Sequence, residues 1–498
     1  MPGMARREPF SALRVLPLLA WAIAAGAAAE AADPPPPNVI LFLTDDQGWT
    51  GTSVRSDPQR ADSKSGYYQT PRLEAFAAQG MRFSRGYAAA PNCSPTRASI
   101  QTGKSPAQLH MTDIIDRPPE PPPDASRTRA GPGRSIFPPP TLKELPREEI
   151  TIAEWIKRAH PQYTTAHFGK WHLGASGPGE QGYDEHDGDT GNEGPAEFED
   201  PNPKDIFGIT ERSIAFLEQR AKDDRPFFMQ ISHYAVHKHI RALGATIERT
   251  KQRRAGHFHT NPGYAAMTED LDTGFGRVLA ALDDLGLSDS TYVIYTSDNG
   301  GLVRRRAMHT TNLPLARGKP ELWEGGIRVP LLVRGPGIPA GSHSDALAIS
   351  WDFFPTIADW LEIDAPPPPG VEGGSLRRVL EGGPPIVERP RDALVWHFPH
   401  YLVPRRAIPH SAIQLDGLKL IALHDSGRTL LYDLAADIGE HENLAKERSE
   451  EAAELARRLG EYLAEIDAPM VSPNPEFEAR WQEHVRRLEK KRKKKHGR

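Results

Sequence analysis

Continuous apolar runs that end in polar residues recur along the first two thirds of the chain. They lie within 38–48, 163–172, 225–232 and 290–295, and segments with helical periodicity stand between them at 70–80, 151–159, 209–222 and 264–285. An apolar run without alternation is typical of a strand buried on both faces, as in a parallel sheet. The repeated order of helix, apolar strand and polar residues therefore predicts an α/β fold with a large, mostly parallel central sheet flanked by helices.

The C-terminal third has a different pattern. Proline-rich turns at 365–370 and 382–385 end the repeating region. Beyond them, alternation at 412–424 and 429–433 predicts antiparallel strands, and 449–466 predicts a helix. We therefore expect three parts after the N-terminus: a large α/β domain over 36–385, a small α+β domain with an antiparallel sheet over 386–470, and a disordered basic tail over 471–498.

Residues 1–32 have the three parts of a secretory signal peptide. A region with Arg6, Arg7 and Arg14 precedes an apolar run at 15–25, and small residues follow to Ala32. The alternative is an uncleaved anchor helix, for which the run is short. We expect an exported protein, periplasmic or extracellular, with no membrane span in the mature chain. The formal net charge of -5 gives no reason to expect a nucleic-acid partner.

Cys93 is the only cysteine in 498 residues, so the chain cannot form an internal disulfide. It stands among turn formers, with Ser94 as an expected N-cap and Pro95 at the first helical position. Cys93 would then precede a helix whose first turn carries Arg97. A lone thiol beside an arginine and a helix N-terminus is a candidate reactive centre; the alternative is a small buried hydrophobe.

Two polar pairs follow apolar strands, Asp45-Asp46 and Asp298-Asn299. In open α/β sheets, ligands bind at the carboxyl ends of the strands. Oxygen-bearing side chains gathered at that edge suit a hard cation such as Ca²⁺ or Mg²⁺. Either pair alone is equally well explained as a turn or a helix cap, but two such pairs favour a metal site.

Positively charged and acid–base residues stand at the ends of other elements. Lys170 and His172 share a face if their segment is extended, and His237 and Lys319 follow at later element ends. With Arg97 they would form a positive pocket around the metal, suited to a tetrahedral oxyanion. A histidine tuned near neutral pH can protonate a leaving alkoxide. Zinc is disfavoured, because the nearby histidines lack cysteine partners and a structural-site spacing.

Together these segments resemble the formylglycine-dependent type I sulfatases of the alkaline-phosphatase superfamily. Cys93-Ser94-Pro95-Thr96-Arg97 is similar to the Cys-x-Pro-x-Arg signature of that family. The other matching segments occur in the family's order: Asp45-Asp46, Gly169-Lys170-Trp171-His172, His233-Tyr234-Ala235-Val236-His237, Ser297-Asp298-Asn299-Gly300, Gly318-Lys319, Trp323-Glu324-Gly325-Gly326, and Leu431-Tyr432-Asp433-Leu434 with Gly439-Glu440. The resemblance implies an alkaline-phosphatase-like fold and an arylsulfatase-like sulfuric ester hydrolase.

The resemblance also implies that a maturation enzyme oxidises Cys93 to formylglycine. One hydroxyl of the hydrated aldehyde would attack sulfur, and the other would expel sulfate. The implied Ca²⁺ ligands, with Mg²⁺ as the alternative ion, are Asp45, Asp46, residue 93, Asp298 and Asn299. By the same resemblance, Arg97 and Lys170 hold formylglycine and sulfate, His172 deprotonates the hydroxyl that expels sulfate, and His237 and Lys319 bind the ester and help to protonate the leaving oxygen. A sulfated carbohydrate or another sulfate ester would be the substrate.

Three features depart from the family pattern. Val236 stands where proline is common, which leaves His233 as an alternative to His237; Asp437-Ile438 replaces a common Asp-Pro; and the proline-rich segment 117–140 has no counterpart. Two other functions compete with sulfate-ester hydrolysis. They are a phosphodiester or phosphonate hydrolase of the same superfamily, and an inactive protein that binds sulfated glycans.

Overall fold

The computed structural model describes residues 36–116, 134–192, 199–303, 310–402 and 407–496. The expected signal peptide therefore lies outside the described residues, as does most of the proline-rich segment. Residues 36–498 form one compact unit. Among the helices of the described residues, none is both long enough and apolar enough to cross a membrane.

A mixed sheet of eight strands forms the centre of the fold, in the order β10-β2-β9-β8-β1-β7-β5-β6. Its strands are β1 (Asn38–Thr44), β2 (Met81–Phe83), β5 (Thr164–Gly169), β6 (Glu185–His186), β7 (Phe227–Ser232), β8 (Thr291–Ser297), β9 (Leu331–Arg334) and β10 (Ser342–Ser344). β1 is parallel to both of its neighbours, β7 and β8, and only β9 runs antiparallel to the strands beside it. The predicted mostly parallel sheet is confirmed.

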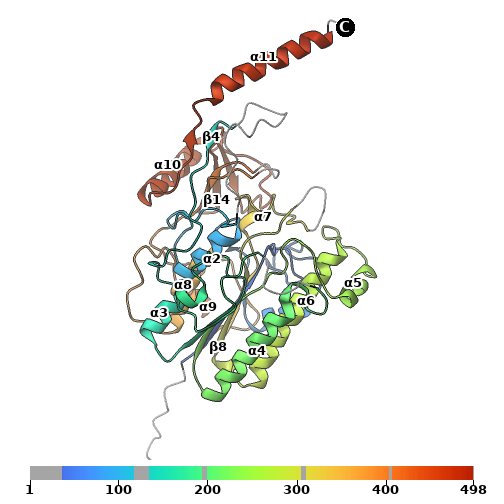
Figure 1. Cartoon of the computed structure of the whole chain (residues 1–498), viewed down its shortest axis with the longest axis vertical. Helices are drawn as coiled ribbons and strands as arrows, with labels where there is room; N and C mark the ends of the chain where they lie inside the picture. The colour runs from blue at the N-terminus through green and yellow to red at the C-terminus, as the bar shows by residue number, and fades with distance from the viewer. Residues whose placement is uncertain (1–35, 117–133, 193–198, 304–309, 403–406, 497–498) are drawn as a thin grey trace, which may run out of the picture. The chain divides into compact units, whose positions relative to one another are not determined.

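Helices cover both faces of this sheet (Figure 1). One face packs against α1 (Pro71–Gln79), α4 (Ile206–Asp223) and α6 (Pro262–Asp284); the other packs against α2 (Cys93–Thr102), α3 (Ile152–Ala159), α8 (Phe353–Trp360) and α9 (Arg377–Leu380). β1 contributes side chains to the hydrophobic cores on both faces of the sheet. Val39 and Leu41 pack into one core, and Ile40 and Phe42 pack into the other. This two-sided burial explains its uninterrupted apolar sequence.

A second sheet of four antiparallel strands follows, formed by β12 (Leu394–Phe398), β13 (His410–Leu415), β14 (Leu418–Leu423) and β15 (Arg428–Asp433). The turn between β13 and β14 is Asp416-Gly417, with φ of 49° and 82°, which suits the right-handed twist of a hairpin. α10 (Ser449–Glu465) packs on one face, and Tyr87, Trp323 and Trp351 pack on the other. The antiparallel strands and the helix are as predicted.

Short elements complete the described chain. They are β3 (Gly86–Tyr87), β4 (Ile136–Phe137), β11 (Ala348–Ile349), β16 (Ser472–Pro473), α5 (Gly244–Lys251), α7 (Glu324–Ile327), α11 (Phe477–His496), and 3-10 turns at Pro178–Gln181, Pro203–Asp205, Ser288–Ser290 and Ser350–Asp352. β4 pairs with β16, so the end of the proline-rich segment contacts the residues that follow α10.

Two expectations differ from the structure. The helix that carries the cysteine begins at Cys93 itself, because Asn92 has extended φ/ψ and occupies the N-cap; Ser94 lies inside the helix, where its hydroxyl accepts from the Ile115 N–H. The tail, expected to be disordered, forms α11. Its Lys, Arg and Glu residues are good helix formers, and ion pairs four residues apart, such as Arg487 with Glu483, support the helix.

Candidate active site

The ends of four neighbouring strands bring the predicted residues to one edge of the central sheet. Asp45 and Asp46 follow β1, Lys170 follows β5, His237 lies beyond β7, and Asp298 follows β8. Gly169, the last residue of β5, has φ of 93°, and a Cβ there would lie 2.0 Å from the Ser232 carbonyl oxygen. Only glycine allows the chain to turn so closely beside β7 before it reaches Lys170.

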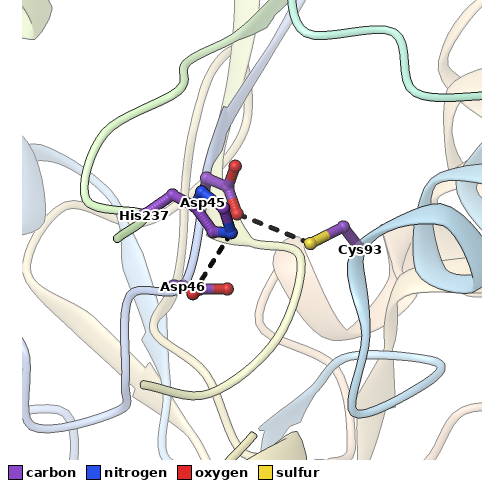
Figure 2. A group of neighbouring side chains, drawn as sticks. All are labelled: Asp45, Asp46, Cys93 and His237. Atoms are coloured by element: carbon purple, nitrogen blue, oxygen red, sulfur yellow. Dashed lines mark hydrogen bonds and ion pairs between the residues drawn. The ribbon is translucent and has the colours of Figure 1, made fainter. Parts of the chain in front are cut away.

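Asp45, Asp46, Cys93 and His237 converge within this edge (Figure 2). One donor atom from each residue lies within 4.8 Å of the others, and all four side chains are buried. Among the described residues this is the only such group of histidine, cysteine and acidic side chains.

Two buried oxygens at this edge make no hydrogen bond to the residues that the structure describes. They are Oδ2 of Asp46 and Oδ1 of Asn299. The other Asp46 oxygen accepts from Asn299 Nδ2 at 2.7 Å, so the two side chains face each other. Buried oxygens without a hydrogen-bond donor are costly unless a cation satisfies them. Together with the Asp45 carboxylate, this all-oxygen set fits a hard divalent cation.

Asp298 is differently engaged. Its Oδ1 accepts from the Asp46 N–H at 3.1 Å, and its Oδ2 accepts from Arg97 Nη2 at 2.8 Å and Nε at 3.1 Å. Asp46 has φ of 61°, a left-handed conformation that aspartate tolerates and that brings its N–H to Asp298. Asp298 therefore holds both the backbone at Asp46 and the side chain of Arg97 in place.

Cys93 lies at the N-terminal end of α2 with its sulfur between charged groups. Sγ is 3.7 Å from Asp45 Oδ1 and 2.8 Å from Lys319 Nζ. Burial raises the pKa of the Cys93 thiol to about 12, because desolvation outweighs the attraction of Lys170 and Lys319. The interpretation as an activated thiolate is therefore not supported: the thiol is protonated at neutral pH.

Three buried cations pair with the three buried carboxylates around Cys93. Arg97 pairs with Asp298, Lys170 Nζ lies 2.6 Å from Asp45 Oδ2, and Lys319 Nζ pairs with Asp46 Oδ1. Burial alone would raise the pKa of Asp45, but the positive charges, Lys170 foremost, hold it well below its usual value. All three carboxylates thus have a cationic partner without any bound ion.

The spacing of Lys170 and His172 predicts that strand alternation puts them on one face, but the structure places them differently. β5 ends at Gly169, and His172 has a left-handed φ of 58°. Lys170 consequently points to Asp45, whereas His172 Nε2 lies 2.9 Å from Asp116 Oδ2. Asn192 connects them, since its Oδ1 accepts from Lys170 Nζ at 2.9 Å and its Nδ2 donates to Asp116 at 2.8 Å.

Asp116 and Asn192 were missed by sequence reasoning. Neither belongs to a matching motif, and no periodic pattern places either of them near Lys170. Asp116 lies immediately before the proline-rich segment 117–140, and Asn192 lies in the aspartate- and glycine-rich loop after β6. Only the distance in space relates them, so a single sequence offers no signal for this contact.

The two candidate histidines after β7 have different surroundings. His237 Nε2 is 3.9 Å from Asp46 Oδ2, at the edge of the sheet. His233 is fully buried, with its ring centroid 4.8 Å from that of Phe42, and burial lowers its pKa to about 3. Burial likewise lowers the pKa of His237 well below its usual value. Of the two, His237 is the one beside the carboxylates.

Comparisons with known proteins show which family the chain resembles. The family model described as "Sulfatase" matches residues 37–363, and the model "N-sulphoglucosamine sulphohydrolase, C-terminal" matches residues 318–468. A "Sulfatase" of Formosa agariphila is 27% identical, covering 92% of this chain and 93% of the relative. Human arylsulfatase A is 28% identical, covering 90% and 91%.

Solved structures share the fold. The crystal structure of Ps i-CgsB in complex with k-i-k-neocarrahexaose superposes with a TM-score of 0.70 at 20% identity, covering 90% of this chain and 97% of that one. At this identity the likeness concerns the fold alone.

Proposed function

Because the chain belongs to the sulfatase family and is a sulfuric ester hydrolase, we propose that it removes sulfate from carbohydrates with formylglycine made from Cys93 and a bound Ca²⁺. The observation that carries this proposal is the cluster around Cys93. Three buried cations and three buried carboxylates surround one small side chain at the carboxyl edge of the sheet. Such a cluster is costly to bury and is best explained by a site for a charged substrate and a cation.

The proposed ion site uses Asp45, Asp46, Asp298, Asn299 and residue 93, with Mg²⁺ as the alternative ion. The two buried oxygens without a hydrogen bond, on Asp46 and Asn299, support it. A divalent ion there supplies charge stabilisation to the sulfate oxygens. His237 also lies within this group, 3.9 Å from Asp46, and we assign it to the leaving oxygen rather than to the ion.

The Cys93 side chain fits conversion to formylglycine better than direct thiol catalysis. A thiol whose pKa is raised to about 12 is a poor nucleophile at neutral pH. When residue 93 is the aldehyde hydrate, its two hydroxyls supply the attack on sulfur and the later release of sulfate. A serine ester would lack the second hydroxyl.

The other side chains bind charge and move protons. Lys319 Nζ, 2.8 Å from Sγ, neutralises negative charge at residue 93 and at the sulfate. Arg97 is held rigidly by Asp298, so its guanidinium is preorganised for the same charge. His237 and Lys319 bind the ester and together help to protonate the leaving oxygen, and His172 takes the proton of the hydroxyl that expels sulfate.

A carbohydrate substrate is supported by the fold neighbour with bound neocarrahexaose, an oligosaccharide. The expected export of the chain agrees with an extracellular or periplasmic polymer as substrate. Burial also requires that the maturation enzyme act on Cys93 before folding is complete, since this residue is 1% exposed in the folded chain. The N-terminal sequence of the mature protein would test the expected signal peptide over residues 1–32.

The central experiment measures hydrolysis of a panel of position-defined sulfated sugars, with protein whose residue 93 has been verified as formylglycine by peptide mass. The wild type should release sulfate, whereas Cys93→Ala should bind sugar but release none. Phosphodiester and phosphonate esters are measured in parallel. A higher kcat/KM on those esters would favour the competing hydrolase, and binding without turnover in verified wild type would favour the inactive glycan-binding protein.

A further inference from the structure

The loop that contains Asn192 is docked on the residues that follow β5. The Asp187 carboxylate accepts from the Gly169 N–H at 2.7 Å, and Thr190 Oγ1 accepts from the Trp171 N–H at 2.9 Å. The Thr190 carbonyl oxygen accepts from the His172 N–H at 2.8 Å. These three bonds fix both the backbone at His172 and the position of the loop beside it.

The side chains above this backbone form a continuous chain of hydrogen bonds. Lys170 donates to Asn192, Asn192 donates to Asp116, and Asp116 faces His172. The His172 side chain is 0% exposed and that of Asp116 is 46% exposed. The carboxylate therefore reaches from the surface onto a fully buried imidazole.

The two nitrogens of His172 have opposite surroundings. Nε2 lies 2.9 Å from Oδ2 of Asp116, which can only accept, and 3.3 Å from Nδ2 of Asn192, which already donates to the same carboxylate at 2.8 Å. The shorter contact to the acceptor assigns the hydrogen to Nε2. Nδ1 is buried and makes no hydrogen bond to the described residues, so it presents its lone pair. Burial, with help from Lys170 and Arg97 and against Asp116, lowers the pKa of His172 to about 4, so the ring is neutral at pH 7.

We propose that Asp116 is a positioning residue of the hydrolase: its carboxylate fixes His172 in the Nε2–H tautomer and leaves Nδ1 as the base, while Asn192 ties the same carboxylate to Lys170. The inference rests on the proposed function only for the role given to His172. A buried base oriented by a carboxylate is a recurring arrangement in acid–base catalysis. Here the carboxylate comes from a residue outside the short matching segments, although inside the region that the family model covers.

The substitution that tests this is Asp116→Asn, which keeps the size of the side chain but can offer an N–H to Nε2. We expect kcat to fall about 10- to 100-fold, with KM changed less than about three-fold. Asp116→Glu keeps the carboxylate and should restore part of the loss. The matched control is Asp189→Asn, an exposed aspartate of the same docked loop, which should behave as wild type.

The second measurement is the tautomer itself, read from the ¹⁵N chemical shifts of histidine-labelled protein, with His172→Gln to assign the signals. Wild type should show a protonated Nε2 and an unprotonated Nδ1, and Asp116→Asn should lose this pattern. If kcat and the tautomer are both unchanged in Asp116→Asn, or if kcat falls while the tautomer stays, the inference is overturned. If wild type hydrolyses no sulfate ester but the tautomer depends on Asp116, the proposed function fails and the positioning role stands.

Discussion

Replacing Lys419 by methionine should strongly destabilise the fold, because this lysine joins the four-stranded sheet to α7 through a buried ion pair. Lys419 lies on β14, fully buried, with Nζ 2.9 Å from Glu324 and 2.9 Å from Glu440. Glu324 also accepts from the Tyr87 hydroxyl at 2.8 Å and pairs with Arg328. Methionine has a similar length, so the change removes the charge and leaves little cavity.

The expected loss in the free energy of unfolding follows from the two ion pairs of Lys419 and from the desolvation of their charges. At an effective dielectric constant near 20, a pair at this distance attracts by roughly 6 kcal/mol, and most of that offsets the burial of the charges. Removing one partner of a buried pair leaves an uncompensated charge and costs about 3–5 kcal/mol. Arg328 still compensates Glu324, so Glu440 is the carboxylate left without a cation.

The loss should depend on pH in a defined direction. Burial raises the pKa of Glu440 to about 7. Between the ordinary pKa of glutamate and that value, Glu440 is protonated in the folded chain but ionised in the unfolded chain. Stability from this group is present at low pH and falls as pH rises toward 7. Without Lys419 its pKa rises further, so Lys419→Met should cost less at pH 5 than at pH 8.

The free energy of unfolding is measured by urea unfolding at pH 5 and pH 8. The proteins compared are wild type, Lys419→Met and Lys446→Met, a control at an exposed lysine. The control should match wild type, since surface substitutions rarely change stability. A loss under about 1 kcal/mol at pH 8, or an equal loss in the control, would refute the argument that buried charge pairing holds the four-stranded sheet against α7.

Two further predictions concern the ion and the hairpin. Treatment with EGTA should abolish sulfate release and lower Tm, and added Ca²⁺ should restore both. An ion at 100 times its Kd contributes about 2.7 kcal/mol to the stability of the folded state. An unchanged Tm and activity would argue against the ion site on Asp46 and Asn299. Gly417→Ala should reduce stability by about 1 kcal/mol in urea unfolding, since φ of 82° is unfavourable for alanine; alanine at Gly460, inside α10, is the control and should not destabilise.

Much of the fold was predictable because local pattern and burial agree. β1 is apolar along its length and is indeed buried on both faces, and the Asp416-Gly417 turn marks the hairpin of the second sheet. The predicted start of α2 was wrong, since Ser94 and Asn92 are both acceptable caps; in the fold, hydrogen bonds with residues distant in sequence engage both side chains, Asn92 with Asp113 and Ser94 with Ile115. The helical tail was missed because a basic composition suits both a helix and a disordered chain.

The site divides in the same way. The sequence predicts that residues at strand ends, such as Asp45 and Asp298, lie close together, because the carboxyl ends of parallel strands meet at one edge of the sheet. The position of Asp116 could not be predicted, because it is placed by a loop whose path no pattern encodes. Lys170 and His172 lie near this edge of the sheet, but the left-handed φ at His172, not strand alternation, sets where its ring points.

The charges of the cluster give a physical reason for a divalent ion. Asp45, Asp46 and Asp298 balance Arg97, Lys170 and Lys319, so without an ion the cluster carries no net charge to attract an anionic ester. A cation bound to the same carboxylates would compete with Lys170 and Lys319 for them and leave both ammonium groups for the substrate. Loss of the ion should therefore raise KM as well as lower kcat, because it restores lysine–carboxylate pairs that the sulfate must then break.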